Sequence, residues 1–161
     1  MEIKDAALRY LEHRMRTEKE MRTRLREKEF AEDEIDDTVS WLKQMGYISD
    51  HSYAAEYLRF GFEKGRGIAR VRAELREKGL SDEDIQKGIY DYEDEHEIDI
   101  MEAEFERALA QAQKTAGTGA FDEKAEAKLG RRLHSLGYGS SVIYKVIGRI
   151  KETARQESCD S

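Results

Sequence analysis

The sequence contains an internal repeat, which restricts the possible folds more than any other feature. Residues 21–30 match residues 71–80 at an offset of 50, and both segments contain the run Leu-Arg-Glu-Lys. A weaker third copy, offset by a further 58 residues, includes Leu129 and Leu133. Repeats of this length are typical of stacked helical units, because one such unit is too small to bury its own apolar face.

Each copy also carries the signals of a short amphipathic helix. Met21 and Leu25 lie one turn apart, and the equivalent apolar pairs of the later copies have the same spacing. Gly79 and Gly137 follow these pairs, at positions where a left-handed glycine commonly ends a helix. Ser81 then has the position of an N-cap residue for the next helix. The pattern therefore predicts two helices joined by a turn in each copy.

An apolar segment precedes each of these pairs, so the sequence predicts nine helices in three three-helix units. The expected helices cover residues 4–15, 17–28, 32–45, 50–63, 67–78, 82–96, 99–114, 122–136 and 140–155. The expected units are 1–48, 49–97 and 98–155, with a disordered tail at 156–161. Residues 115–119 are the best candidate for a linker, and the acidic stretch 91–106 has an alternative interpretation as one long bridging helix.

Composition agrees with a layered helical array. Hydrophobic residues make up 39% of the chain, charged residues make up another 39%, and proline is absent. This balance fits an elongated assembly of thin helical layers that each bury one apolar stripe. The predicted fold class is all-α, with three tandem three-helix repeats. A plain helical bundle is the alternative that composition leaves open.

Several classes of protein lack support in the sequence. Cys159 is the only cysteine, so no disulfide framework is expected. No segment approaches the roughly 20 apolar residues that a membrane span needs. The N-terminus lacks the apolar core of a secretory signal. We therefore expect a cytoplasmic protein with no membrane partner.

No site for catalysis or for a cofactor is recognisable. Gly65 and Gly67 have part of the spacing of a phosphate-binding loop, but no strand is predicted before them and the third glycine is missing. The four histidines are scattered and lack the spacing of metal ligands. We predict no catalytic residue, no metal and no cofactor, and a protein that is not an enzyme.

A longer ordered pattern spans residues 6–90. Its first segment contains Ala7, Tyr10, Leu11, Arg14, Arg16, Thr17, Glu18, Glu20, Met21, Leu25 and Lys28. Its second contains Trp41, Leu42, Gly46, Tyr47, Ile48, Ser49, Asp50, Tyr53, Ala54 and Tyr57. Its third contains Gly67, Arg70, Val71, Glu74, Leu75, Lys78 and Gly79. In this order and spacing the residues resemble the RecX family of recombination regulators. The chain departs from the family pattern at Glu29, where a glycine is usual, and at an insert that includes residues 117–119.

The resemblance implies a curved, elongated array of tandem three-helix repeats. It also implies a regulator that binds the RecA recombinase filament on DNA, along the filament groove, and mostly inhibits strand exchange, ATP hydrolysis and co-protease activity. The implied partners are the filament and the single- or double-stranded DNA within it. Capping of a growing filament end and binding along the groove both agree with this function. A monomer is expected, because each unit can bury its face on its neighbour.

The net charge is −7, but its sign alternates along the chain. Residues 1–28 and 51–80 each carry +3, and residues 107–161 carry +4. Residues 29–50 carry −6 and residues 81–106 carry −11. Because like charges oppose association with a DNA backbone, these acidic segments favour a protein–DNA filament over bare DNA as the target.

Basic residues recur at the repeat spacing and form the candidate binding surface. Arg22 and Arg26 lie one turn apart on a different face from Met21, and Arg72 and Arg76 repeat this placement. Guanidinium groups suit the task because they bind phosphates or carboxylates through paired donors. The candidate residues for filament or DNA binding are Arg14, Arg16, Lys19, Arg22, Arg26, Arg66, Arg70, Arg72 and Arg76.

Simpler interpretations stand beside this one. The arginines are also explained as solvated side chains that pair with nearby acids such as Glu27 and Glu77. The turn at 61–67 is a second candidate contact, because Phe60 and Phe62 cannot both lie on one narrow stripe and one of them is expected to be exposed. Alternative functions are a helical-repeat scaffold that recruits another protein and a direct DNA-binding protein.

Overall fold

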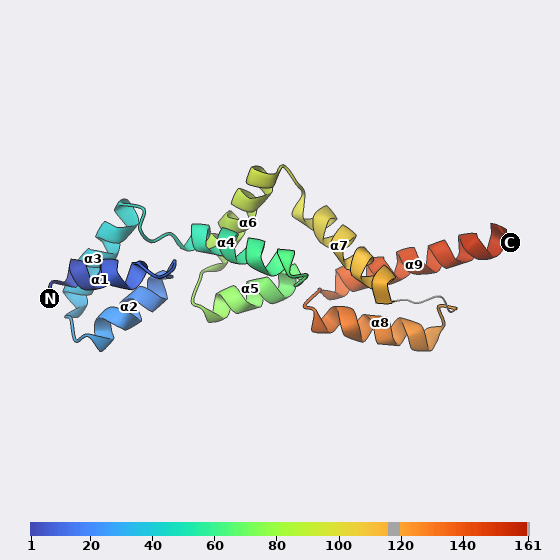
Figure 1. Cartoon of the computed structure of the whole chain (residues 1–161), viewed down its shortest axis with the longest axis horizontal. Coiled ribbons are helices and arrows are strands. Elements are labelled where there is room, and N and C mark those ends of the chain that lie inside the picture. The colour runs from blue at the N-terminus through green and yellow to red at the C-terminus, as the bar shows by residue number, and fades with distance from the viewer. Residues whose placement is uncertain (116–119, 161) are drawn as a thin grey trace. The chain divides into compact units, whose positions relative to one another are not determined.

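The computed structural model describes residues 1–115 and 120–160, and within these ranges it contains nine helices and no strand (Figure 1). The helices are α1 (Ile3–Leu11), α2 (Glu18–Glu27), α3 (Glu32–Gln44), α4 (Asp50–Glu63), α5 (Ile68–Glu77), α6 (Asp82–His96), α7 (Ile100–Thr115), α8 (Glu123–Ser135) and α9 (Ser140–Asp160). The all-helical prediction is therefore confirmed. The predicted linker falls mostly at 116–119, outside the described residues.

The chain divides into two compact units. The first comprises Met1–Tyr57 and Ala73–Tyr92, and the second comprises Leu58–Arg72 and Glu93–Ser161. Helices α4, α5 and α6 therefore contribute residues to both units. The limits of the three repeats at residues 48 and 97 remain a prediction.

The first unit has a core built from one face each of α1, α2 and α3. Met21 and Leu25, the apolar pair expected from the repeat, are both fully buried. The core residues are Ala6, Ala7, Met21, Leu25, Ile35, Val39, Leu42 and Ile48. Spacings of three and four residues place each helix's contribution on one stripe, as the sequence predicted.

The second unit has an equivalent core between α7, α8 and α9. Leu129 and Leu133, the third copy of the apolar pair, are buried there at 5% and 0% exposure. The core residues are Ala108, Ala112, Leu129, Leu133, Tyr138 and Val146. The weak third copy of the repeat therefore forms the same kind of amphipathic helix as the first.

Helix α1 ends at Leu11, earlier than the expected residue 15. The carbonyl oxygen of Tyr10 accepts a hydrogen bond of 3.1 Å from Nε of Arg16, and the Arg16 guanidinium lies 3.9 Å from the centre of the Tyr10 ring. In a continuing helix that carbonyl would accept from the backbone N–H four residues later. The Arg16 side chain therefore donates to the carbonyl that a further helical turn would otherwise have satisfied.

The acidic stretch 91–106 forms two helices, so the alternative of one long bridging helix is wrong. Helix α6 ends at His96 and α7 begins at Ile100, and Glu97 between them has φ 53°. The Asp99 carboxylate accepts hydrogen bonds from the backbone N–H groups of Met101 and Glu102 at 2.9 and 3.1 Å. An N-cap of this kind favours a new helix over a continuous one. Helix α9, by contrast, runs beyond residue 155 to Asp160.

The left-handed residue that follows the second helix is a glycine in two copies and a glutamate in one. Gly79 and Gly137 have φ of 92° and 95°, as predicted, and Glu29 has φ 66° at the equivalent place. A side chain in this region of φ and ψ costs roughly 1–2 kcal/mol, because Cβ approaches the following carbonyl. Glu29 is thus a strained residue at the position where the other two copies have glycine.

We predict that Glu29→Gly raises the free energy of unfolding by about 1 kcal/mol, because glycine removes this strain. The matched control is Lys28→Gly, since Lys28 has φ −86° and gains nothing from glycine. Urea unfolding followed by circular dichroism measures both variants. Equal destabilisation by the two substitutions would contradict the strain at Glu29.

Candidate functional site

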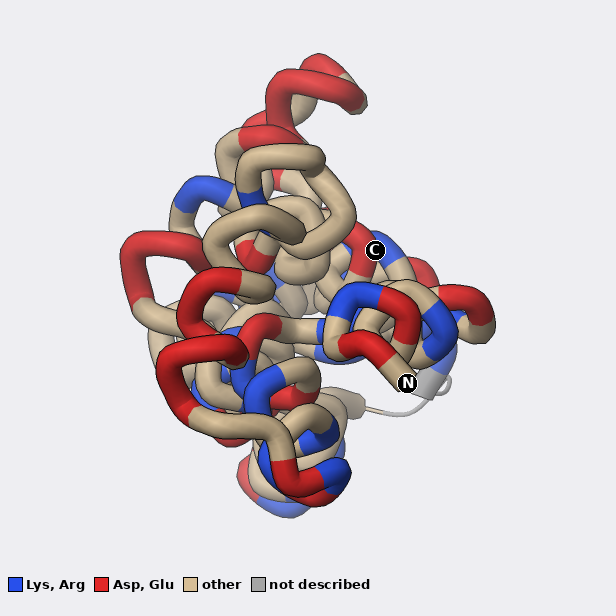
Figure 2. The backbone as a smooth tube through the Cα atoms, turned by 90° about the vertical axis from the view of Figure 1, so that its left-hand side faces the viewer, with Lys and Arg blue, Asp and Glu red and all other residues tan. Residues whose placement is uncertain are grey.

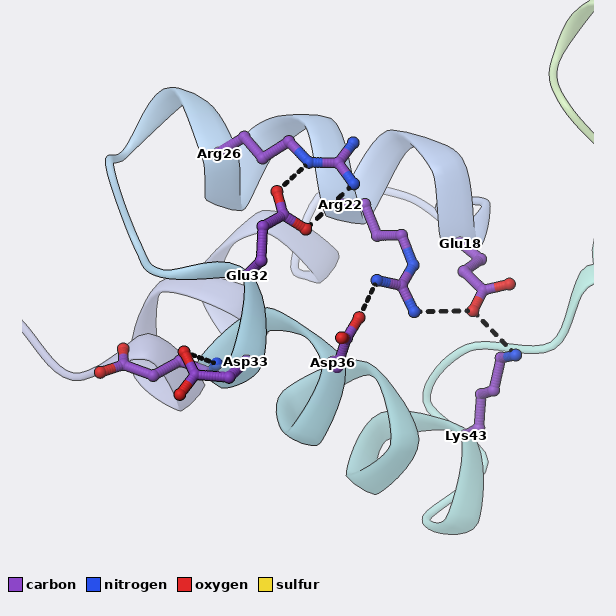
Figure 3. A network of polar contacts seen from close by, with 8 residues as sticks. Glu18, Arg22, Arg26, Glu32, Asp33, Asp36 and Lys43 are labelled. Atoms are coloured by element: carbon purple, nitrogen blue, oxygen red, sulfur yellow. Dashed lines mark hydrogen bonds and ion pairs between the residues drawn. The ribbon is translucent and has the colours of Figure 1, made fainter.

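Arg22 lies at the centre of a chain of ion pairs between α2 and α3 (Figure 3). Its Nη1 lies 2.6 Å from Oδ1 of Asp36 and its Nη2 lies 3.5 Å from Oε1 of Glu18. Nζ of Lys43 lies 2.8 Å from the same Glu18 oxygen. The hydrogen bond to Asp36 is the main cause of a raised pKa at Arg22. Arg22 is therefore neutralised by acids of its own repeat.

Arg26 and Arg76 make the same ion pair in successive repeats. Nε of Arg26 lies 2.5 Å from Oε1 of Glu32, and Nε of Arg76 lies 2.7 Å from Oδ1 of Asp82. Both pairs join residues six apart, and all four side chains are at least half exposed. The hydrogen bond to Arg26 is the main cause of a lowered pKa at Glu32. The first residue of α3 thus supplies the acid that pairs with Arg26, and the first residue of α6 supplies the acid that pairs with Arg76.

Arg14 and Arg16 share one acid at the start of α2. Nη2 of Arg14 lies 2.7 Å and Nη1 of Arg16 lies 3.7 Å from Oε2 of Glu20. The Arg16 side chain is only 12% exposed, because it packs on Tyr10, whereas that of Arg14 is 51% exposed. Arg16 is therefore held within the fold, whereas the Arg14 side chain stays half exposed in its ion pair with Glu20.

Lys19 is exposed and forms no ion pair within the described part of the chain. Its aliphatic stem lies against Gly79 in the turn between α5 and α6. Together with Arg14 it lines an open hollow of about 440 Å³. The other residues that line this hollow are Tyr10, Glu20, Thr23, Arg24, Glu27, Glu77 and Lys78.

The remaining candidates lie in and after the turn between α4 and α5. Arg66 and Arg72 are half-buried, and Arg70 is exposed beside Gly137. At the end of α4, before this turn, Phe62 is buried and Phe60 is 51% exposed, with Nζ of Lys64 4.1 Å from the centre of the Phe60 ring. The prediction that one of these two rings is exposed is confirmed.

A carboxylate from the second helix along the chain fixes the start of each arginine helix, from α4 for α2 and from α7 for α5. Oδ1 of Asp50 accepts a 3.0 Å hydrogen bond from the N–H of Glu18, and Oε2 of Glu104 accepts one of 2.6 Å from the N–H of Ile68. Burial raises the pKa of both carboxyl groups. Sequence analysis missed these contacts, because their partners are 32 and 36 residues apart.

Charges of both signs are mixed along the whole chain, as Figure 2 shows with short blue and red stretches of backbone. In the described residues no three side chains of His, Cys, Asp or Glu are placed to hold a metal ion. None of the described helices has the length and apolar composition to cross a membrane. Of the candidate binding residues, five are exposed polar side chains on the helical repeats: Arg14, Lys19, Arg26, Arg70 and Arg76.

Comparison with known proteins identifies the family. The family model described as the first three-helix domain of RecX matches residues 4–42, and that of the second three-helix domain matches residues 49–89. A protein named Regulatory protein RecX from Clostridium acetobutylicum is 32% identical over 147 residues, covering 91% of this chain and 68% of its own length. Another protein of that name, from Clostridium beijerinckii, is 29% identical over 150 residues, which cover 93% of this chain and 68% of the relative.

Solved structures agree with this result. The crystal structure of RecX from Lactobacillus salivarius is similar with a TM-score of 0.78 and 25% identity, over 92% of this chain and 94% of that one. A second crystal structure of a regulatory protein RecX gives a TM-score of 0.71 and 27% identity, over 91% and 70%. The chain is thus a helical-repeat regulatory protein. It belongs to the RecX family.

Proposed function

We propose that this protein binds the RecA recombinase filament on DNA and inhibits its strand exchange, ATP hydrolysis and co-protease activity. The observation that carries the proposal is the exposed arginine–carboxylate pair that recurs in two repeats, Arg26 with Glu32 and Arg76 with Asp82. A surface that repeats along the protein suits a partner that repeats along a filament. The relatives named Regulatory protein RecX support a regulatory role.

The ion pairs themselves suggest how such a surface works. Exposed ion pairs contribute only about 0–1 kcal/mol, so each guanidinium can exchange its carboxylate for a phosphate oxygen or an acid on the partner. The internal acids compete for the same arginines and therefore weaken binding to bare DNA. This competition favours a protein–DNA filament as the target. In this proposal the protein acts as a monomer and catalyses no reaction.

The first test is the time course of DNA-dependent ATP hydrolysis by the cognate RecA after this protein is added to preformed filaments on single-stranded DNA. We expect the rate to fall. A fall at ratios far below one per RecA subunit indicates capping of growing ends, whereas saturation along the lattice indicates binding in the groove. Unchanged hydrolysis at every ratio, with a folded protein, would favour the scaffold alternative.

The arginine pairs give a prediction with two opposite signs. Arg26→Ala combined with Arg76→Ala should raise the concentration for half-inhibition about ten-fold, the equivalent of 1.4 kcal/mol. Glu32→Gln combined with Asp82→Asn removes the internal competitors and should lower that concentration. Circular dichroism checks that helicity is unchanged. Equal inhibition by all three proteins would exclude these arginines from the interface.

A further inference from the structure

The third copy of the repeat lacks the arginine–carboxylate pairs of Arg22 with Asp36 and of Arg26 with Glu32, but it keeps the pair of Lys43 with Glu18 as Lys151 with Glu126. Gly130 and Tyr144 occupy the positions of Arg22 and Asp36, at an offset of 108. By the same offset His134 and Ser140 replace the pair of Arg26 and Glu32. The first turn of α9 contains no acidic residue. Of the acids that neutralise the arginines of the first repeat, Asp36 and Glu32 have no acidic counterpart here, whereas Glu18 corresponds to Glu126.

As a result, α8 and α9 carry basic side chains that no acid neutralises. Residues 122–160 contain eight Lys and Arg and six Asp and Glu. Within the described residues 120–160 the only ion pair joins Lys151 to Glu126, at 2.9 Å. Arg131 and Arg155 are exposed, and the described structure gives neither an acidic partner. Residues 122–160 therefore carry a net charge of +2 in a protein whose net charge is −7.

Tyr144 lies on this surface with an open ring. It is 82% exposed, more than any other exposed large hydrophobic side chain of the described structure. Tyr144, Gly148, Lys151 and Arg155 follow one another at helical spacings of four, three and four, so they share one face of α9. A Cβ added to Gly148 would have no atom within 4 Å, so nothing covers this face one turn beyond the ring.

Helix α8 packs beside α9 at this point. A Cβ added to Gly130 would lie 3.9 Å from Cδ1 of Ile147, which places Gly130 next to α9. Glycine here stands where the first two repeats have the arginines Arg22 and Arg72. Arg131 follows Gly130 directly and is exposed. We call Tyr144, Gly148, Lys151 and Arg155 the Tyr144 face, and Arg131 is the exposed basic residue of the adjacent helix α8.

We propose that the Tyr144 face binds single-stranded nucleic acid, with an unpaired base stacked on Tyr144 and phosphates bound by Arg131 and Arg155. Proteins bind single strands through an aromatic ring that stacks on a base and a basic groove that follows the backbone. A duplex offers phosphates but no free base face. This inference deepens the proposed function by naming its contact with DNA, and for its biological setting it rests on that function.

The molecule provides its own control for the aromatic ring. Tyr90 is 61% exposed on α6, but the residues that follow it are Asp91, Glu93 and Asp94. Lys87 on the same helix is exposed and forms no ion pair within the described residues. An exposed tyrosine and an exposed cation among acids should not attract phosphates, because like charges oppose the strand.

The test is fluorescence anisotropy of a labelled 20-nucleotide oligothymidylate titrated with the full chain. Tyr144→Ala should weaken binding about ten-fold, within the range that loss of one stacked base produces. Tyr144→Phe should bind like the wild type, and so should Tyr90→Ala. Tyr144→Trp should show fluorescence quenching on addition of the oligonucleotide, which is a direct signal of stacking.

Salt dependence tests the cations separately. Each phosphate contact on a single strand contributes about 0.7 to the slope of log affinity against log salt. Arg131→Ala combined with Arg155→Ala should therefore reduce that slope by about 1.4. Lys87→Ala should leave it unchanged.

Two results would overturn the inference: equal affinity of Tyr144→Ala and Tyr90→Ala, or equally tight binding of a duplex of the same length. A wild-type chain that inhibits RecA but does not bind the oligothymidylate would refute the Tyr144 face and leave the proposed function standing. Tight bare-strand binding that depends on Tyr144, without any inhibition of RecA, would do the reverse.

Discussion

Gly67→Ala should lower the free energy of unfolding by about 3 kcal/mol, at the upper end of what overpacking typically costs. A Cβ at this position would lie 2.2 Å from the carbonyl oxygen of Gly137, 2.3 Å from its carbonyl carbon and 2.4 Å from the backbone nitrogen of Tyr138. All three are backbone atoms, so no side-chain rotation relieves the clash.

The start of α5 would have to move away from the turn between α8 and α9. That movement breaks two hydrogen bonds, from the N–H of Gly67 to the carbonyl of Leu136 at 2.9 Å and from the N–H of Arg70 to the carbonyl of Gly137 at 3.2 Å. The N–H groups of Gly67 and Arg70 would then lose their carbonyl acceptors, and the loss of these hydrogen bonds adds to the steric cost.

Urea unfolding of Gly67→Ala and Gly148→Ala measures this contact against a matched control. Gly148 lies within α9, and a Cβ there has open space around it. Alanine should therefore stabilise this helix by roughly 0.5–1 kcal/mol. Shifts of the same sign and size at the two glycines would contradict the close approach at Gly67.

The repeat predicted the helices well, because its signals are local. The pair Met21 and Leu25 is buried as the one-turn spacing requires, and Gly79 and Gly137 are left-handed at the predicted helix ends. Each of these features depends on residues within one or two turns of the chain. Such short-range patterns can be interpreted without knowing how the helices pack.

The ion-pair partners of the arginines were not predictable in the same way. Sequence analysis offered Glu27 as a nearby acid, and Arg24 does approach it at 3.9 Å. Arg22 and Arg26, however, pair with Asp36 and Glu32 across the turn to α3. Which acids face α2 depends on how α3 packs against it, and that is a property of the tertiary structure.

Tyr144 was also missed, although the sequence contained a usable signal. The third copy was aligned through its apolar positions, which match well because they form the core. Its polar positions differ, since Gly130 replaces an arginine and Tyr144 replaces an acid. Comparing surface positions of the repeats, and not only core positions, would have found the change.

Glu104→Ala should destabilise the chain by about 2 kcal/mol, because it removes the acceptor for the first N–H of α5 at a buried site. Glu104 is 7% exposed, and its Oε2 lies 2.6 Å from the backbone nitrogen of Ile68. The cap would be lost and a small cavity would replace the carboxyl group. Glu104→Gln keeps an oxygen acceptor and should not destabilise the chain at neutral pH.

The same pair of variants separates the hydrogen bond from the charge. Burial raises the pKa of Glu104 above its ordinary value, so the folded chain binds this proton more tightly than the unfolded chain. Stability from this group is therefore fully present below the unfolded pKa and is lost as pH rises through the raised folded pKa. Asp50 has a pKa raised by burial and adds a contribution of the same sign.

Urea unfolding at a series of pH values should show this decline in the wild type and a flatter profile in Glu104→Gln, which has no proton to lose. At neutral pH the free energy of unfolding of the glutamine variant should equal or exceed that of the wild type. The alanine variant should be less stable than the wild type at every pH. An unchanged pH profile in Glu104→Gln would show that the buried carboxyl group does not titrate differently in the folded chain. The N–H of Ile68 would then need only an oxygen acceptor, charged or neutral, to hold α5 in place.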